Sequence, residues 1–330
     1  MASRSKTTPK SSKVPAKSVR SGRVEKSQSG SSKVTGLTKS SSAYAQDFEQ
    51  HLIDVQIYPD DYYEDGHQKS RKAANHDEIK LRLKKPQEKF SAATFSEADF
   101  EKVRHMLNKP RSEVTLIEAL ISVLQLDSTI PREREQRFNN LEPLTEVMLT
   151  CASPDFYDGA SAARIHPDVR KKLSGFIQPS TRPELPFVPN FFLEVKRLLG
   201  GDGGVLARQA LHNGALGARA MHELRSFGIP DSDRTYCNAD TITAAFIQGS
   251  SLKFYSMHYG APDQDSGISD KYMYLLAGHS LDDSYESFLA GATAFCNARE
   301  WAKERRDNAI ALANQRASEM AKNRASAAGG

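Results

Sequence analysis

The chain has 330 residues, of which 38% are hydrophobic and 26% are charged. The hydrophobic share is lower than the ~45–50% apolar content of a compact soluble domain, which predicts a folded body with unfolded appendages. No run of about 18 apolar residues is present, and the N-terminal segment lacks the apolar block of a secretory signal. We therefore expect neither a membrane-spanning nor a secreted protein, and no membrane partner.

The formal net charge of +4 is unevenly distributed. Residues 1–42 contain ten Lys or Arg and a single acid, Glu25, so they carry +9 and the rest of the chain carries −5. Their thirteen serines and sparse apolar residues predict a disordered tail, because such a segment cannot bury enough surface to offset chain entropy. A second disordered tail is predicted at 321–330. Only the basic tail has the charge that non-specific contact with nucleic acid requires.

The three cysteines, Cys151, Cys237 and Cys296, are far apart and odd in number. This pattern favours free thiols in a reducing compartment, and hence an intracellular protein of the nucleus or cytoplasm. A mitochondrial transit peptide is disfavoured because the apolar residues of the tail are too few to form one face of a helix. Nothing in the sequence indicates the oligomeric state.

Residues 43–140 predict a helical N-terminal portion. Apolar residues recur at helical spacing over 48–55, and 114–126 is an apolar helical run. Ser96 followed three residues later by Asp99 is the pattern of a helix start. The end of this portion is charged and interrupted by a proline, which is typical of a linker or a surface crossing.

Residues 141–320 predict shorter, alternating elements, consistent with an α/β core. We expect a helix or strand at 145–149, a turn-bearing stretch at 153–159, a helix at 167–173, a proline-rich loop at 179–189, strands at 191–196, 241–248, 252–259 and 271–277, a helix at 205–227 and a long closing helix at 284–320. The strands on either side of Gly249-Ser250 are expected to form a hairpin.

The strongest local signal for chemistry is Glu194, inside the apolar run 191–196. Strand alternation places Glu194 and Lys196 on one face. A buried carboxylate without a partner costs several kcal/mol, so Glu194 requires a cation, supplied by Lys196, a metal, or both. The other acid-x-lysine pair, Glu78 and Lys80, lies in a polar helical stretch and is interpreted as a solvated surface pair.

A proline-aspartate, Pro154-Asp155, precedes this strand in the sequence. A proline-aspartate, then an acid-x-lysine on the next strand, then a helix is the order of the PD-(D/E)XK nuclease core. Four segments together resemble a fungal domain family of unknown function that is similar to a divergent branch of this restriction-endonuclease-like superfamily. They are PDFYDG at 154–159, PNFFLEVK at 189–196, QALHNGALGARA at 209–220 and GATAFCNAREWA at 291–302, and the resemblance extends from about residue 44 to residue 314.

The resemblance implies an α/β (α+β) fold with a central mixed sheet flanked by helices, a helical N-terminal portion and a long C-terminal helix. It places Asp155, Glu194 and Lys196 at the motif positions and Gln209 on the helix behind them. In such a core the two acids bind a divalent metal, here Mg²⁺, and the lysine steadies the attacking water or the phosphate. A third acid upstream is expected, with Glu146 or Glu118 as candidates.

These observations lead to a first hypothesis, a Mg²⁺-dependent phosphodiesterase acting on DNA or RNA. The alternative is a catalytically inactive nuclease-fold module that binds other molecules or nucleic acid, and the net charge of −5 outside the tail favours it. A third reading is a nucleotide binder that uses the glycine loop at 200–204, although this loop lacks the Lys-Ser/Thr of a P-loop.

Other polar and aromatic residues have ordinary structural explanations. Asp155 also fits a simple turn after proline, and Asp158 before Gly159 is interpreted as turn chemistry. Four histidines lack metal-ligand spacing and are interpreted as surface or packed residues: His212, His222, His258 and His279. Three aromatic residues near helical spacing are expected to face the core: Phe288, Phe295 and Trp301.

Overall fold

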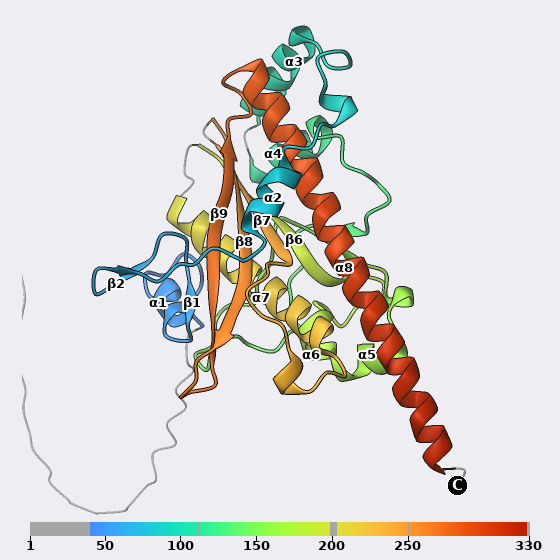
Figure 1. The fold of residues 1–330 in the computed structure, drawn as a ribbon. Coiled ribbons are helices and arrows are strands. Elements are labelled where there is room, and N and C mark those ends of the chain that lie inside the picture. Colours follow the sequence, from blue (N-terminus) through green and yellow to red (C-terminus); the bar gives the residue numbers. More distant parts are fainter. Residues whose placement is uncertain (1–39, 111, 199–202, 250, 329–330) are drawn as a thin grey trace, which may run out of the picture. The chain divides into compact units, whose positions relative to one another are not determined.

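A seven-stranded mixed sheet organises the computed structural model, which describes residues 40–110, 112–198, 203–249 and 251–328 (Figure 1). The strands are β1 (Ile57–Tyr58), β4 (Arg132–Glu133), β5 (Phe156–Ala160), β6 (Phe187–Lys196), β7 (Thr241–Ile247), β8 (Leu252–Pro262) and β9 (Ser269–His279). Their order in the sheet is β1-β9-β8-β7-β6-β5-β4. Two neighbouring pairs, β1 with β9 and β6 with β7, are parallel, and the other neighbours are antiparallel. A separate hairpin pairs β2 (Tyr63–Glu64) with β3 (His67–Gln68).

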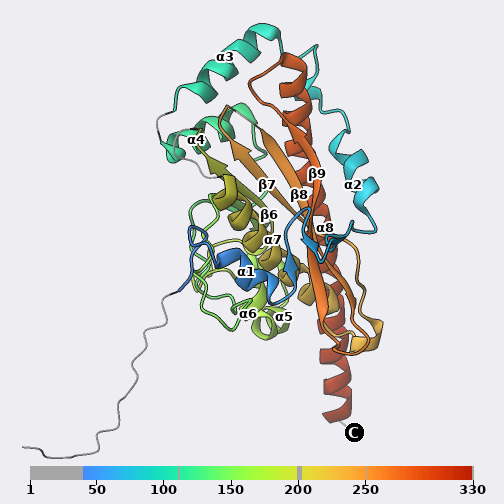
Figure 2. The same cartoon turned by 90° about the vertical axis from the view of Figure 1, so that its left-hand side faces the viewer.

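Helices cover both faces of this sheet. They are α1 (Phe48–Ile53), α2 (His76–Leu83), α3 (Glu97–Asn108), α4 (Glu113–Val123), α5 (Pro167–Lys172), α6 (Ser174–Ile177), α7 (Gly203–Ser226) and α8 (Tyr285–Ala328), with 3-10 turns η1 (Glu88–Phe90), η2 (Ala162–Arg164) and η3 (Asp231–Asp233). Figure 1 shows α8 running across one face, and in the turned view of Figure 2 α7 and α8 lie on opposite sides of the strands.

The alternation of side chains along β6 explains this layering. Phe191, Leu193 and Val195 belong to one hydrophobic cluster with Phe295 of α8. Phe192 belongs to another cluster, with Leu216 of α7. Both faces of β6 are therefore covered, which explains why every residue of the strand is buried and why apolar residues occur on both faces.

Most long elements lie where the sequence predicts them. Helix α3 begins with a capping box in which Ser96 accepts from the backbone N–H of Asp99 and the Asp99 carboxylate accepts from that of Ser96. The predicted β7–β8 hairpin is antiparallel. The three aromatic residues of α8 are buried as expected, with Phe288 and Phe295 fully inside.

The predicted turn at 153–159 is wrong, because Phe156–Ala160 is a buried strand. Asp158 is not a turn residue but a fully buried partner of Arg299. Gly159 is required for close packing instead of a turn: a Cβ there would lie 2.5 Å from the carbonyl oxygen of Phe187. Dense packing between neighbouring strands, rather than chain reversal, explains this Asp-Gly pair.

The N-terminal portion at 43–140 is helical but also contains the β2–β3 hairpin and supplies two strands to the sheet. β1 extends the sheet beside β9, and β4, in the stretch predicted as a linker, pairs with β5. The closing helix continues past its predicted end at 320 to Ala328, through a segment rich in the helix-forming residue Ala. The basic tail up to residue 39 and most of the predicted glycine loop, 199–202, lie outside the described residues.

All three cysteines are free thiols. Across the described ranges, every helix is too short or too polar to cross a bilayer.

Candidate functional site

The sheet brings the two predicted acids to the same edge of neighbouring strands. Asp155 directly precedes β5, and Glu194 lies near the end of β6. The antiparallel register pairs Phe156 with Leu193, so Asp155 is the residue that comes opposite Glu194. Residues opposite one another on antiparallel strands share a face, and here that face is the one covered by α7.

Asp155 is held by the neighbouring strand. Its Oδ2 accepts a hydrogen bond of 2.7 Å from the backbone N–H of Val195. Burial raises the pKa of Asp155 to about 6, although the Lys196 ammonium and the Val195 N–H oppose the shift. The Asp155 carboxyl therefore titrates closer to neutrality than an ordinary aspartate.

Glu194 is fully buried and only half satisfied. Its Oε1 accepts a hydrogen bond from Nδ2 of Asn213 on α7. Its Oε2 is also buried and has no hydrogen-bond partner among the described residues. Burial, and then the nearby Asp155 carboxylate, raise the pKa of Glu194 well above its usual value. This side chain thus requires either a proton or a cation at Oε2.

Lys196 lies at the end of the same strand and is 4% exposed. Its Nζ donates to Oε2 of Glu113 and to the carbonyl oxygen of Val195, each at 3.3 Å. Burial alone lowers the pKa of Lys196, but Asp155, Glu113 and Glu194 outweigh it and raise the pKa overall. Lys196 is therefore a permanent cation among carboxylates.

Glu113, the first residue of α4, was not identified from the sequence. The acids considered upstream lie elsewhere: Glu118 is 3.7 Å from Arg134, and Glu146 is exposed. The sequence does carry one usable signal, because Ser112 and Thr115 form a capping box that marks where α4 begins. An acid in the first turn of a helix interacts favourably with the helix dipole, so the position of Glu113 at the start of α4 does not by itself indicate a site.

A cavity of about 160 Å³ opens beside Glu194. Gln209, His212 and Asn213 of α7 line one side, and residues 42–44 and 150–153 line the other. Asp155 and Lys196 are not among its lining residues, so Glu194 is the motif residue that reaches it. The Oε1 of Gln209 is buried and has no hydrogen-bond partner in the part of the chain that the structure describes. Two acceptor oxygens without partners therefore belong to residues of one cavity.

Two glycines let α7 approach the sheet closely enough to build this cavity. A Cβ at Gly217 would lie 2.6 Å from the ring of Phe192 and 2.9 Å from Thr241, and one at Gly214 would lie 3.3 Å from Thr243. Larger residues would push α7 away and remove Asn213 from Glu194. The glycines of segment 209–220 thus have a direct structural role.

A second cavity, of about 290 Å³, adjoins the first and shares Thr150, Cys151, Ala152 and His212 with it. Its walls are mainly apolar and include Phe138 and Leu216. Burial, and then Arg219, lower the pKa of His212 to about 4, so this histidine is neutral at pH 7. It packs edge-on against Phe48, as expected for a packed histidine.

The donor set for a metal is small. Within the described ranges, no group of three or more His, Cys, Asp or Glu side chains is arranged to hold an ion. Asp155 and Glu194 offer two carboxylates, of which one oxygen of Glu194 has no partner. This set fits Mg²⁺, which keeps several waters and uses one or two protein carboxylates, better than a metal that needs a full protein cage.

Comparisons of the chain with protein-family models, with curated proteins and with solved structures give no match.

Proposed function

We propose that the protein is a Mg²⁺-dependent phosphodiesterase of the PD-(D/E)XK type that acts on DNA or RNA. The observation that carries the proposal is the buried Oε2 of Glu194, which has no described partner and lies in the field of Asp155. A protein that used Glu194 only for stability would pair both oxygens, because an unsatisfied buried acceptor costs about 1–3 kcal/mol.

The order of elements supports the same function. Asp155 precedes β5, Glu194 and Lys196 follow on the adjacent strand β6, and the next element is α7 with Gln209. This is the order that the resemblance implies. Without such an arrangement the resemblance would have rested on four short segments alone.

Each residue then has a role that its surroundings allow. Asp155 and Glu194 would hold the ion, which when bound polarises a phosphate and lowers the pKa of a water. Lys196, kept protonated by its three acidic neighbours, stabilises negative charge that develops on the phosphate. Gln209 presents an acceptor oxygen that orients a water or a substrate hydroxyl in the cavity.

A second candidate function is a binding module without catalysis. The two-carboxylate donor set and the net charge of −5 outside residues 1–42 favour it, since a groove for a nucleic-acid backbone is normally cationic. In this reading the tail supplies the affinity and the site beside Glu194 takes no part.

The test is cleavage of plasmid DNA, single-stranded DNA and RNA by the full chain in Mg²⁺ or Mn²⁺. We expect Glu194→Gln, which keeps the shape of the side chain, to reduce cleavage by about 10²–10³-fold. The matched control is Glu78→Gln, which alters the other acid-x-lysine pair on an exposed face of α2 and should leave the rate unchanged.

Two results would contradict the proposal. One is binding of nucleic acid without cleavage in either metal, which would support the binding module. The other is equal cleavage by the wild type and by Glu194→Gln, which would place the activity in a contaminant or in another site.

A further inference from the structure

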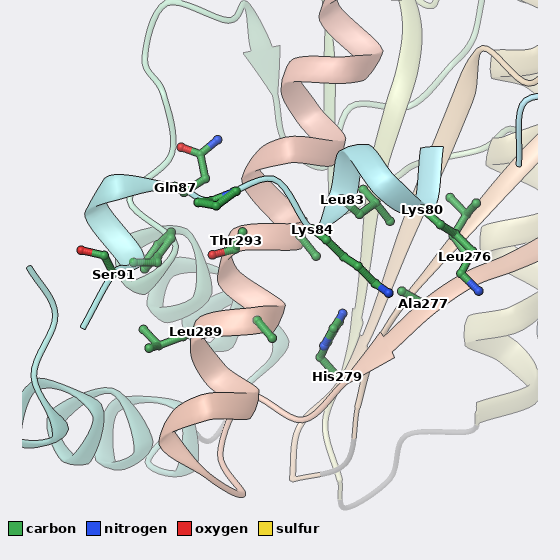
Figure 3. Close-up of a pocket in the computed structure, with 14 residues that line it drawn as sticks. Lys80, Leu83, Lys84, Gln87, Ser91, Leu276, Ala277, His279, Leu289 and Thr293 are labelled. Atoms are coloured by element: carbon green, nitrogen blue, oxygen red, sulfur yellow. The ribbon is translucent and has the colours of Figure 1, made fainter. Parts of the chain in front are cut away.

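A third cavity lies on the α8 side of the sheet, away from the two cavities described above. It has a volume of about 320 Å³ and is enclosed by α2, η1, the end of β9 and the first turns of α8 (Figure 3). Buried apolar residues form its floor: Leu83, Phe90, Leu276 and Ala294. None of the residues discussed for the phosphodiesterase takes part in it.

The basic groups of this cavity gather at one end. Figure 3 shows Lys80, Lys84 and His279 beside β9, with Leu289 and Ser91 at the opposite end. Neither lysine forms an ion pair or a side-chain hydrogen bond with a described residue, and no Asp or Glu lines the cavity. Burial, and then Lys84, lower the pKa of His279, as expected beside an unneutralised cation.

The walls are held in place without a ligand. Asn297 of α8 is fully buried, and its Nδ2 donates to the carbonyl oxygens of Leu83 and Lys85 at 3.0 and 2.6 Å. Gln87, the residue before η1, donates to Oδ1 of Asn297 at 2.8 Å, so the start of η1 is held by the same asparagine. A ligand entering this cavity therefore spends little free energy on ordering the protein.

Gly291 fixes the distance between α8 and the end of β9. A Cβ at this position would lie 2.7 Å from Leu281 and 3.0 Å from the Cβ of His279. The close approach brings His279 to the same cavity as Thr293. The glycine that opens the segment 291–302 thus has a role in shaping this cavity.

We infer that this cavity binds a small amphipathic anion, with a carboxylate or phosphate head at Lys80, Lys84 and His279 and an apolar body along Leu83, Phe90 and Leu289. The lysines supply charge complementarity for the head, since each is a point charge without a counter-ion. The volume is at the lower end of the ~300–1,000 Å³ of small-molecule cavities. A protein partner would need about 800 Å² of surface, far more than this cavity offers.

The experiment is calorimetric titration of the full chain with decanoate and with decyl phosphate, each below its micelle concentration. Decanol, which has the same apolar body without charge, is the comparison ligand. We expect one site per chain for at least one of the two anions and an affinity at least tenfold weaker for decanol. The relative affinity of the two anions identifies the preferred head.

Variants then locate the site. Lys80→Gln combined with Lys84→Gln should weaken anion binding at least tenfold, and Thr293→Phe should block it by filling the apolar end. The matched control changes two exposed lysines that line none of the cavities described, Lys102→Gln with Lys322→Gln, and should bind as the wild type does. All four lysines are exposed, three on helices and Lys84 directly after the end of α2, so both double variants should fold.

Three results would overturn the inference: decanol binding as tightly as the anions, unchanged affinity in the Lys80/Lys84 variant, or equal losses in both double variants. Self-association of the chain that Thr293→Phe abolishes would also overturn it, because the occupant would then be a second copy. Loss of nuclease activity would have no bearing on these measurements.

Discussion

Two aspartates three residues apart, the half-buried Asp155 just before β5 and the buried Asp158 within it, have different surroundings. Asp158 faces α8, where Arg299 donates to both of its oxygens at 2.7 and 2.8 Å. Asp155 faces α7, and the residue opposite it on β6 is Glu194, which is half satisfied. Asp158 is therefore neutralised by Arg299, whereas Asp155 and Glu194 have too little positive charge beside them.

This difference separates a structural ion pair from a candidate binding site. Arg299 and Arg306 are both buried in the α8 layer, and Arg306 donates to Asn190 of β6. This network joins α8 to the sheet, and both oxygens of Asp158 accept hydrogen bonds within it. On the α7 face, Lys196 is one cation beside three acids, since Asp155, Glu113 and Glu194 together raise its pKa.

The largest expected effect comes from breaking the closed pair. Asp158→Ala leaves Arg299 buried without a partner, and we expect a loss of about 3–5 kcal/mol in the free energy of unfolding. Glu194→Gln, measured without metal, should be neutral or stabilising because it removes an uncompensated charge. Urea unfolding of both variants checks the contrast, and equal losses would show that Glu194 is structural after all.

The pH dependence of stability is the next effect. The pKa of Asp155 is raised from the usual 3.8 to about 6 in the folded state, so the folded protein binds this proton more tightly than the unfolded chain does. The resulting stabilisation is fully present below pH 4 and is lost as the pH rises through about 6. Its size is on the order of 3 kcal/mol.

Asp155→Asn should remove this loss between pH 4 and pH 6. The measurement is the difference in unfolding free energy between wild type and variant across that window in a chelating buffer, since other groups titrate equally in both proteins. Parallel curves for the two proteins would mean that Asp155 is ionised normally, and the electrostatic basis of the metal site would then be lost.

Binding of a divalent metal should offset the loss of stability that the Asp155 and Glu194 carboxylates cause. Mg²⁺ at about one hundred times its dissociation constant stabilises the folded protein by about 2.7 kcal/mol, seen as a rise in Tm. Glu194→Gln and Asp155→Asn should each abolish the rise, whereas Asp158→Asn, on the other face of the sheet, should keep it. A rise that all three variants retain would place the ion elsewhere.

Part of this site was accessible from the sequence for a clear physical reason. Glu194 stands out because a charged residue inside a run of apolar strand residues must be compensated, and alternation alone gives its face. Asp155 could be paired with it only through the resemblance, since nothing local indicates which strand lies beside β6.

The remainder depends on tertiary packing. Asn213 and Glu113 reach Glu194 and Lys196 from helices whose positions relative to the sheet no local pattern encodes. The Asp-Gly pair at Asp158 predicted a turn because local propensity carries no information about Arg299, which lies 141 positions away. The same limit applies to the 320 Å³ cavity, because it brings residues 80–91 together with residues 276–294, which are distant in the sequence.

The smallest expected effect comes from substitution of Glu113, which tests the difference between the Asp155 site and the Asp158 ion pair. Its side chain is 41% exposed, so Glu113→Gln should cost no more than about 1 kcal/mol of stability, in contrast to any change at Asp158. Because Glu113 raises the pKa of Asp155, its loss should move the pH-dependent fall in stability to lower pH. Unfolding curves across the same pH window measure this shift. A large loss of stability with no shift would mean that Glu113 belongs to the structural network and that Lys196 is a packing residue rather than a charge placed beside the Glu194 site.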